Sequence, residues 1–202
     1  MYEVILSFIT AFAVTYFAIP SIIHIARVKG LCDEPGERRS HTESTPSLGG
    51  VGIFAGLIFS VVLWTPFHLF NDLQYILCAF IIIFFVGIKD DIIPVPPHKK
   101  LFGELIAAGI LVFKANVKIT SLYGLFGMTI LPLWISAPLS IFTIIVIINA
   151  FNLIDGINGL SGSIGVLIAV TLGTWFILID RFELSVIAYA TAGAAVAFLK
   201  YN

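Results

Sequence analysis

A group of amides, a carboxylate and glycines interrupts one of the most apolar stretches of the chain. The apolar run covers residues 141–148, and the amide cluster that follows it consists of Asn149, Asn152, Asp155, Gly156 and Asn158. Polar side chains at the end of a bilayer-crossing helix are costly when left dry, so they have to face water, a metal ion or a polar ligand. Because Asn149, Asn152 and Asp155 recur every three residues, a helix would keep them on one broad face. The pattern predicts a polar cavity, where we expect the chemistry of the protein.

Two adjacent carboxylates, Asp90 and Asp91, follow another apolar run and form an acid–lysine cluster with Lys99 and Lys100. Two acids at a helix end can simply be hydrated. They can also hold Mg²⁺, which proteins bind through one or two carboxylates together with the phosphate oxygens of a substrate. The lysines can neutralise the same phosphates, although a cytoplasmic excess of basic residues explains them equally well. Glu104 either faces this polar centre or is a stabilising acid near the N-terminus of its helix.

A polar loop between the first two apolar runs carries the loop cluster, Arg38, His41, Gly49 and Gly50. One interpretation is a solvated loop whose basic residues face the cytoplasm. The other is anion binding, since Arg38 offers a planar fork for phosphate oxygens and His41 can donate to them. The two glycines would then let the backbone approach the anion at a helix entrance. Both interpretations stay open for this cluster taken alone.

The elements that must position these residues are membrane helices. The chain has 202 residues, of which 59% are hydrophobic, and its mean hydropathy is +1.05, whereas an ordinary soluble domain is about 45–50% apolar. Seven apolar windows can cross, or nearly cross, a hydrocarbon core of about 30 Å; they are residues 4–26, 50–67, 73–88, 101–113, 134–148, 160–179 and 184–199. We therefore expect an all-α membrane protein with about seven transmembrane helices. The net charge of −1 indicates no polyanionic partner such as a nucleic acid.

The distribution of basic residues predicts the orientation of these helices. When the connections are assigned alternately to two sides, one side receives Arg27, Lys29, Arg38, Arg39, Lys89, Lys99, Lys100 and Lys200, and the other receives Lys114, Lys118 and Arg181. The positive-inside rule places the first side in the cytoplasm. We therefore expect the N-terminus outside, the C-terminal residue inside, and all three clusters on the cytoplasmic face.

The rest of the chain carries structural expectations. Residues 116–132 alternate polar and apolar side chains around Gly124 and Gly127, which predicts a small β-hairpin on the outer side. The first apolar run follows no basic leader and no cleavage site, so we expect it to be retained as an anchor. Because no internal repeat or linker divides the sequence, we expect a single integral membrane domain over residues 1–202.

Together the three clusters resemble three successive signatures of one known family, the polyprenyl-phosphate N-acetylhexosamine-1-phosphate transferases of glycosyltransferase family 4. The matching residues are Asp33, Pro35, Arg38, His41, Pro46, Gly49 and Gly50 in the loop, Gly87, Asp90 and Asp91 in the acid–lysine cluster, and Asn149, Asn152, Asp155 and Gly156 in the amide cluster. The resemblance spans residues 28–162. It is greatest to the undecaprenyl-phosphate branch that transfers N-acetylglucosamine 1-phosphate.

The resemblance implies a multi-pass enzyme of the bacterial plasma membrane in which a polyprenyl phosphate displaces UMP from a UDP-amino sugar, starting lipid-linked glycan synthesis. The implied cofactor is Mg²⁺, or Mn²⁺ in its place, with Asp91 and Asp155 as metal ligands. Asp90 and Asp91 would form the catalytic acidic pair, one accepting the proton of the lipid phosphate, and which of them does so stays open. Asp155 would complete the catalytic set. The implied substrate-binding residues are Arg38, His41, Lys99, Lys100, Asn149, Asn152, Gly156 and Asn158.

Two features depart from the family pattern. Asn158 stands where many members carry aspartate, so one negative charge is missing on the uridine side of the pocket, although an amide can still pair with uracil. Members also continue past the region where this chain ends into a glycine-aspartate signature that supplies a further metal-site carboxylate. The expectation is therefore a C-terminally truncated member with impaired activity.

Two other classes compete with the enzyme. A small-solute transporter would bind its solute at the break in residues 149–159, but it should place the break near the middle of the membrane and show inverted halves. Neither pattern is present in the sequence. A non-catalytic membrane subunit descended from the enzyme would differ from it only in an assay. The sequence leaves open the amino sugar, the lipid length, the final polymer and the oligomeric state.

Overall fold

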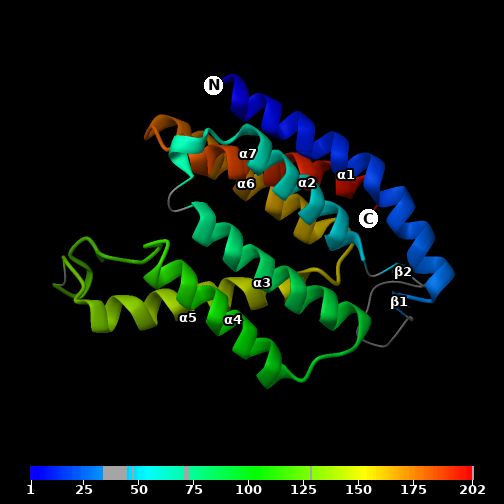
Figure 1. Ribbon diagram of the computed structural model, residues 1–202. Helices are drawn as coiled ribbons and strands as arrows, with labels where there is room; N and C mark the ends of the chain where they lie inside the picture. The colour runs from blue at the N-terminus through cyan, green and yellow to red at the C-terminus, as the bar shows by residue number, and fades with distance from the viewer. Residues whose placement is uncertain (34–44, 47, 71–72, 128, 202) are drawn as a thin grey trace. The chain divides into compact units, whose positions relative to one another are not determined.

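The computed structural model describes residues 1–202 except 34–44, 47, 71–72, 128 and 202. In these described ranges the chain forms seven α-helices (Figure 1). Their bounds are α1 Tyr2–Lys29, α2 Gly49–Trp64, α3 Leu73–Ile92, α4 Pro97–Phe113, α5 Leu133–Ile154, α6 Leu160–Leu178 and α7 Phe182–Leu199. Each apolar window of the sequence overlaps one of these helices. The prediction of an all-α fold is therefore confirmed.

The helices belong to two compact units. Unit 1 comprises Met1–Phe70 and Leu153–Asn202 and contains α1, α2, α6 and α7. Unit 2 comprises Asn71–Asn152 and contains α3, α4 and α5 up to Asn152. The acid–lysine cluster and the first two amides of the amide cluster therefore lie in unit 2, whereas Asp155 lies in unit 1. The single membrane domain stays a prediction.

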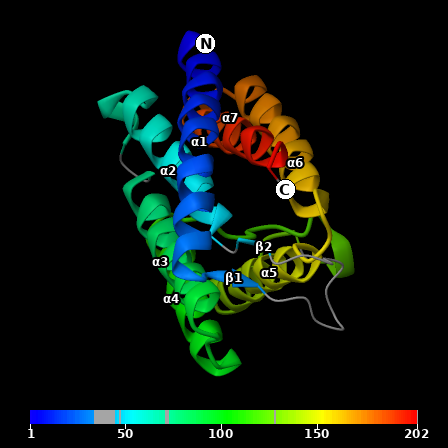
Figure 2. The same ribbon diagram turned by 90° about the vertical axis from the view of Figure 1, so that its right-hand side faces the viewer.

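Small residues let the helices of unit 1 approach closely. Figure 2 shows α1 beside α2 and α7, and α6 also packs against α7. A side chain on Gly193 of α7 would place its Cβ only 2.2 Å from the carbonyl oxygen of Phe8 in α1. Ser60 Oγ of α2 donates a hydrogen bond to the carbonyl oxygen of Ser7 in α1 at 2.7 Å. Such contacts hold helices together where lipid removes the ordinary hydrophobic driving force.

In unit 2, α3 and α4 pack against each other, with Gly103 of α4 lying against the Val86 side chain of α3. Pro97 occupies the first position of α4, where a missing N–H removes no helical hydrogen bond. Among the described residues, α5 makes no comparably extensive contact with α3 or α4. Its first half is tied instead to the preceding connection, because the backbone N–H of Ile119 donates to Ser140 Oγ at 2.8 Å.

The chain is a membrane protein. Among the described residues, α1, α5, α6 and α7 are each long and apolar enough to cross a bilayer. Large apolar side chains on these helices are exposed, with Phe17 and Trp134 each at 75% and Leu167 at 68%. Surfaces of this kind suit a lipid environment, where every backbone polar group is satisfied inside a helix. The count of seven spans and their orientation stay predictions.

The β-hairpin predicted over residues 116–132 is not supported. The described part of this segment contains one isolated antiparallel bridge, between Ser121 and Ile130, and a 3-10 helix at Leu125–Gly127. Gly124 and Gly127 have φ values of +89° and +73°, a conformation that glycine adopts readily. Paired strands lie elsewhere: β1 Cys32–Asp33 runs antiparallel to β2 Thr45–Pro46, on either side of the segment that carries Arg38 and His41.

Candidate active site

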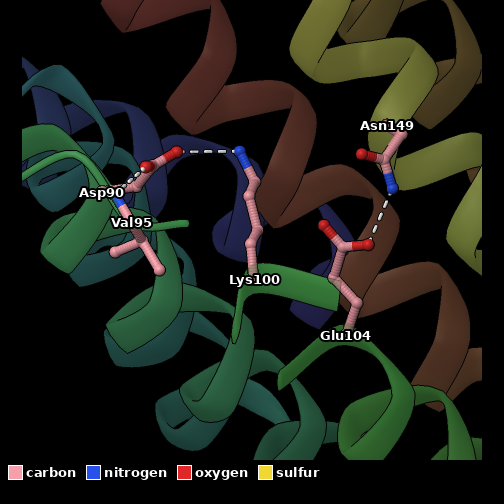
Figure 3. Close-up of polar contacts among 5 residues, drawn as sticks. All are labelled: Asp90, Val95, Lys100, Glu104 and Asn149. Atoms are coloured by element: carbon pink, nitrogen blue, oxygen red, sulfur yellow. Dashed lines mark hydrogen bonds and ion pairs between the residues drawn. The ribbon is translucent and has the colours of Figure 1, made fainter. Parts of the chain in front are cut away.

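Asp90 joins the end of α3 to the start of α4. It lies beyond the apolar run of α3, and its Oδ2 accepts a hydrogen bond from Lys100 Nζ at 2.9 Å (Figure 3). Its Oδ1 accepts a second bond from the backbone N–H of Val95 at 3.0 Å. The Lys100 and Asp90 side chains are 19% and 29% exposed. Both carboxylate oxygens of Asp90 therefore hold the turn between the two helices.

The same contacts decide the protonation of Asp90. Partial burial raises the pKa of its carboxyl. The hydrogen bonds from Lys100 and from the Val95 N–H, together with the charge of Lys100, lower the pKa by more than burial raises it. The net pKa of Asp90 lies below its ordinary value. Asp90 is therefore a carboxylate at neutral pH and a weak acceptor of a further proton.

The neighbours of this pair have different surroundings. Asp91 and Lys99 are exposed, whereas Asp90 and Lys100 are half-buried. The sequence could not separate the two members of either pair. The structure separates them by burial, because one exposed carboxylate and one exposed ammonium group lie beside the half-buried ion pair.

A second polar contact joins α4 to α5. Asn149 Nδ2 donates to Glu104 Oε2 at 2.7 Å and to the carbonyl oxygen of Ile145 at 3.0 Å. Glu104 is only 2% exposed, and its Oε1 has no hydrogen-bond partner among the described residues. Because Glu104 lies two turns into α4, outside the first turn, the helix-terminus interpretation is wrong. The alternative placed Glu104 at the acid–lysine cluster, whereas the partner that the structure shows is Asn149 of the amide cluster.

Lys100 and Glu104 lie four residues apart, so they share one face of α4. Figure 3 shows the two side chains rising from this helix in the same direction. One face of α4 therefore gives a cation to the carboxylate of α3 and a carboxylate to the amide of α5. Within unit 2, these two pairs connect the helices that carry Asp90, Lys100 and Asn149.

Asn152 lies in the last turn of α5, and the other remaining residues of the amide cluster follow the end of this helix. Asn152, Asp155, Gly156 and Asn158 are all exposed. Asp155 Oδ1 accepts a hydrogen bond from Ser161 Oγ, at the start of α6, and Gly159 turns the chain with φ +70°. Ser161 was not among the predicted site residues, although a hydroxyl just inside a helix that follows a glycine turn is a recognisable local signal.

Two predicted site residues, Arg38 and His41, lie outside the described residues. Neither unit, where the structure describes it, brings together three His, Cys, Asp or Glu side chains that could hold a metal ion alone. The structure thus gathers Asp90 with Lys100 and Asn149 with Glu104, and it leaves Asp91, Lys99, Asn152 and Asp155 as exposed polar groups.

These observations define a class: a helical membrane protein with carboxylates, a held lysine and an oriented amide near the ends of its helices. Ionisable side chains retained beside or within membrane helices usually mark a functional site. Residues 73–202, more than half of the chain, match the model of glycosyl transferase family 4. The chain belongs to this family, which confirms the resemblance seen in the three clusters.

Relatives align along nearly the whole chain. The decaprenyl-phosphate N-acetylglucosaminephosphotransferase of Mycobacterium tuberculosis is 28% identical over 218 residues, which cover 99% of this chain and 54% of the relative. The probable undecaprenyl-phosphate N-acetylglucosaminyl 1-phosphate transferase of Bacillus subtilis is 26% identical over 203 residues, covering 100% and 56%. The undecaprenyl-phosphate alpha-N-acetylglucosaminyl 1-phosphate transferase of Escherichia coli O157:H7 is 25% identical over 181 residues, covering 88% and 48%. The chain thus spans about half the length of the curated relatives it matches.

Proposed function

We propose that this chain carries part of a transferase that moves N-acetylglucosamine 1-phosphate from a UDP-sugar to a polyprenyl phosphate. The observation that carries the proposal is the family match over residues 73–202, which includes both polar pairs. In the proposed reaction, an oxygen of the lipid phosphate bonds to the phosphorus nearest the sugar. The bond from that phosphorus to the bridging oxygen breaks, and UMP leaves with that oxygen and the electron pair.

In this scheme Asp90 is a holding group and Asp91 is the carboxylate that meets the substrate. Both oxygens of Asp90 are engaged and its pKa is lowered, so it is poorly suited to accept a proton. Asp91 is exposed at the same helix end. We therefore assign the contact with the lipid phosphate to Asp91.

Lys100 suits phosphate oxygens because its ammonium group is already fixed. Asp90 accepts one of its three N–H groups, and the others remain donors. A charge that is held in place before the substrate arrives stabilises a transition state more than a charge that must be ordered. Lys99, which is exposed, adds a second positive charge beside it.

The proposal includes a divalent cation. Mg²⁺ prefers oxygen ligands and usually takes one or two carboxylates together with substrate phosphates. Asp91 in unit 2 and Asp155 in unit 1 both carry exposed carboxylates. Ser161 donates a hydrogen bond to Asp155 and so orients it. A bound cation would neutralise charge on the diphosphate. The cytoplasmic face, the plasma membrane and the roles of Arg38, His41, Asn152, Gly156 and Asn158 belong to the same proposal.

The test uses membranes that contain this chain, incubated with radiolabelled UDP-N-acetylglucosamine and undecaprenyl phosphate. The chain covers only about half of the length of its relatives. A chimera in which residues 1–202 replace the matching segment of the Bacillus subtilis protein is therefore assayed beside it. Labelled lipid and released UMP from either protein are the expected result. If neither protein makes labelled lipid while the intact Bacillus subtilis protein does, the proposed function is wrong.

A further inference from the structure

The Asn149 amide is held in one orientation. Its Nδ2 carries two hydrogens, and it donates one bond to Glu104 Oε2 and one to the carbonyl oxygen of Ile145. The only other polar atom of the side chain is Oδ1, which can only accept. Asn149 therefore offers a hydrogen-bond acceptor, and no donor, to anything that approaches it.

Glu104 is the group that decides this orientation. The Ile145 carbonyl is the ordinary i−4 backbone acceptor and is present whatever occupies position 104, whereas the Glu104 bond comes from another helix. Without Glu104, rotation about the last side-chain bond would let the amide present its NH₂ group instead. The polarity of the site at Asn149 would then change from acceptor to donor.

Packing does not account for a carboxylate at this position. Glu104 is among the largest fully buried side chains, and burying a carboxylate in a membrane protein is expensive. Its Oε1 has no hydrogen-bond partner among the described residues. In the view of Figure 3, this oxygen and Asn149 Oδ1 both turn to the side of the pair where Lys100 lies. Both oxygens are thus acceptors that, in this view, turn toward the fixed ammonium group, and Glu104 Oε1 is buried.

We propose that Glu104 is a positioning residue that fixes the Asn149 amide as an acceptor for a donor group of the substrate or for its bound cation. This inference rests on the proposed transferase function, because it assigns Glu104 a role in that site. Glu104 itself touches no reacting atom. It acts through Asn149, so the two residues should behave as one unit when they are substituted.

Substitutions that exchange carboxylate and amide groups test the Glu104–Asn149 pair. Asn149→Asp keeps the shape of the side chain but sets two carboxyl groups against each other, and we expect kcat/KM to fall at least about tenfold. Glu104→Gln keeps an acceptor oxygen for Asn149, so activity should stay within about threefold of the wild type. The double variant Glu104→Gln with Asn149→Asp restores a donor and an acceptor and leaves one acceptor oxygen outward. It should be at least about threefold more active than Asn149→Asp alone, and recovery stays incomplete because a carboxylate oxygen then faces the Ile145 carbonyl in place of the amide donor.

Two further variants separate orientation from stability. Glu104→Met keeps most of the volume but removes the acceptor, and kcat/KM should fall about tenfold or more. Ser140→Ala is the control. Ser140 carries a buried hydroxyl on α5, the helix of Asn149, and its hydrogen bonds connect it to Ile119 and Ser136. This substitution should lower the thermal unfolding temperature in detergent without changing kcat/KM. All variants are made in whichever protein, the chain or the chimera, forms labelled lipid.

The result that overturns the inference is a double variant no more active than Asn149→Asp, or a Glu104→Met variant with full activity. Recovery of the unfolding temperature without recovery of kcat/KM would also overturn it, because the contact would then be structural only. Failure of the proposed function would appear in the unsubstituted protein, as an absence of labelled lipid. Failure of the positioning role appears only in the variants of an active protein.

Discussion

Replacing Asp90 by asparagine removes one charge from the α3–α4 turn and keeps its shape. The asparagine oxygen can still accept from the Val95 N–H, so the main loss is the ionic bond to Lys100, which is 2.9 Å long. Hydrogen bonds to charged groups contribute about 1.5–3 kcal/mol to stability, and exposed ion pairs contribute about 0–1 kcal/mol. Because these side chains are 29% and 19% exposed, we expect a value between the two ranges, about 1–2 kcal/mol.

A double-mutant cycle measures this value. Asp90→Asn, Lys100→Gln and the double variant are unfolded thermally in detergent, and the coupling free energy between the two positions is compared with the estimate. Lys99→Gln serves as the stability control, because Lys99 is an exposed neighbour of the same type. Its effect on unfolding should stay within about 0.5 kcal/mol. A coupling below about 0.5 kcal/mol would show that Asp90 does not hold Lys100.

The pH dependence of the coupling follows from the lowered pKa of Asp90. A carboxyl whose folded-state pKa lies below its unfolded value stabilises the fold above the unfolded pKa, near 4, and loses that stabilisation as pH falls through the folded pKa. The coupling should therefore be constant between about pH 5 and 8 and should disappear only in stronger acid. A coupling that falls across the neutral range would contradict the lowered pKa.

The same substitution also affects catalysis. If Lys100 is a charge fixed for phosphate oxygens, releasing it in Asp90→Asn should lower kcat/KM more than tenfold, which corresponds to over about 1.4 kcal/mol in the barrier. The assay is the transfer of radiolabelled sugar phosphate to undecaprenyl phosphate. Retention of more than about a tenth of the activity by both Asp90→Asn and Asp91→Asn would remove the acidic pair from the mechanism.

Four further predictions concern other parts of the molecule. Asp91→Asn should abolish transfer without changing thermal stability, because the side chain is exposed; a matching loss of stability would argue for a structural role. Ser161→Ala removes the donor to Asp155 and should destabilise the protein by about 1 kcal/mol, measured by thermal unfolding, with a severalfold loss of activity. A chelator should stop turnover and Mg²⁺ or Mn²⁺ should restore it, with Ca²⁺ a poor substitute; unchanged turnover in the chelator would exclude the metal. Gly193→Ala should destabilise by about 1–3 kcal/mol, because its Cβ would lie 2.2 Å from the Phe8 carbonyl oxygen; wild-type unfolding would show that the two helices can separate freely.

Hydropathy predicted where the helices lie but not where they end. The apolar window 73–88 stops at the first charges, yet α3 continues to Ile92, and α5 continues past window 134–148 to Ile154. Apolar windows report which residues suit lipid, whereas a helix continues as long as its backbone bonds are made. Both extensions carry predicted site residues, Asp90 and Asn149. Hydropathy therefore did not predict the helix ends on which these residues lie.

The composition of the site was predictable, but its pairing was not. Residue types and spacing selected Asp90, Lys100 and Asn149, and no local pattern indicated that the Val95 N–H would bind Asp90 or that the partner of Glu104 would be Asn149. Which side chains pair depends on how α3 packs against α4 and on which way α4 is rotated. Both are features of the tertiary structure, which local sequence patterns do not report. The usable signal was the four-residue spacing of Lys100 and Glu104, which places both on one helical face.

That spacing makes α4 the common reference for both neighbouring helices in unit 2. Lys100 fixes the end of α3 through Asp90, and Glu104 fixes the end of α5 through Asn149, one turn apart on the same rigid element. A rotation or shift of α4 therefore cannot disturb one contact and spare the other. Because α5 packs only weakly on α4 in the described residues, the Glu104 contact is the more sensitive of the two. A residue inserted between Lys100 and Glu104 does not rotate α4 as a whole. It turns the part of the helix after the insertion by about 100° relative to the part before it, so it should break the Asn149 contact while leaving the Asp90 pair in place.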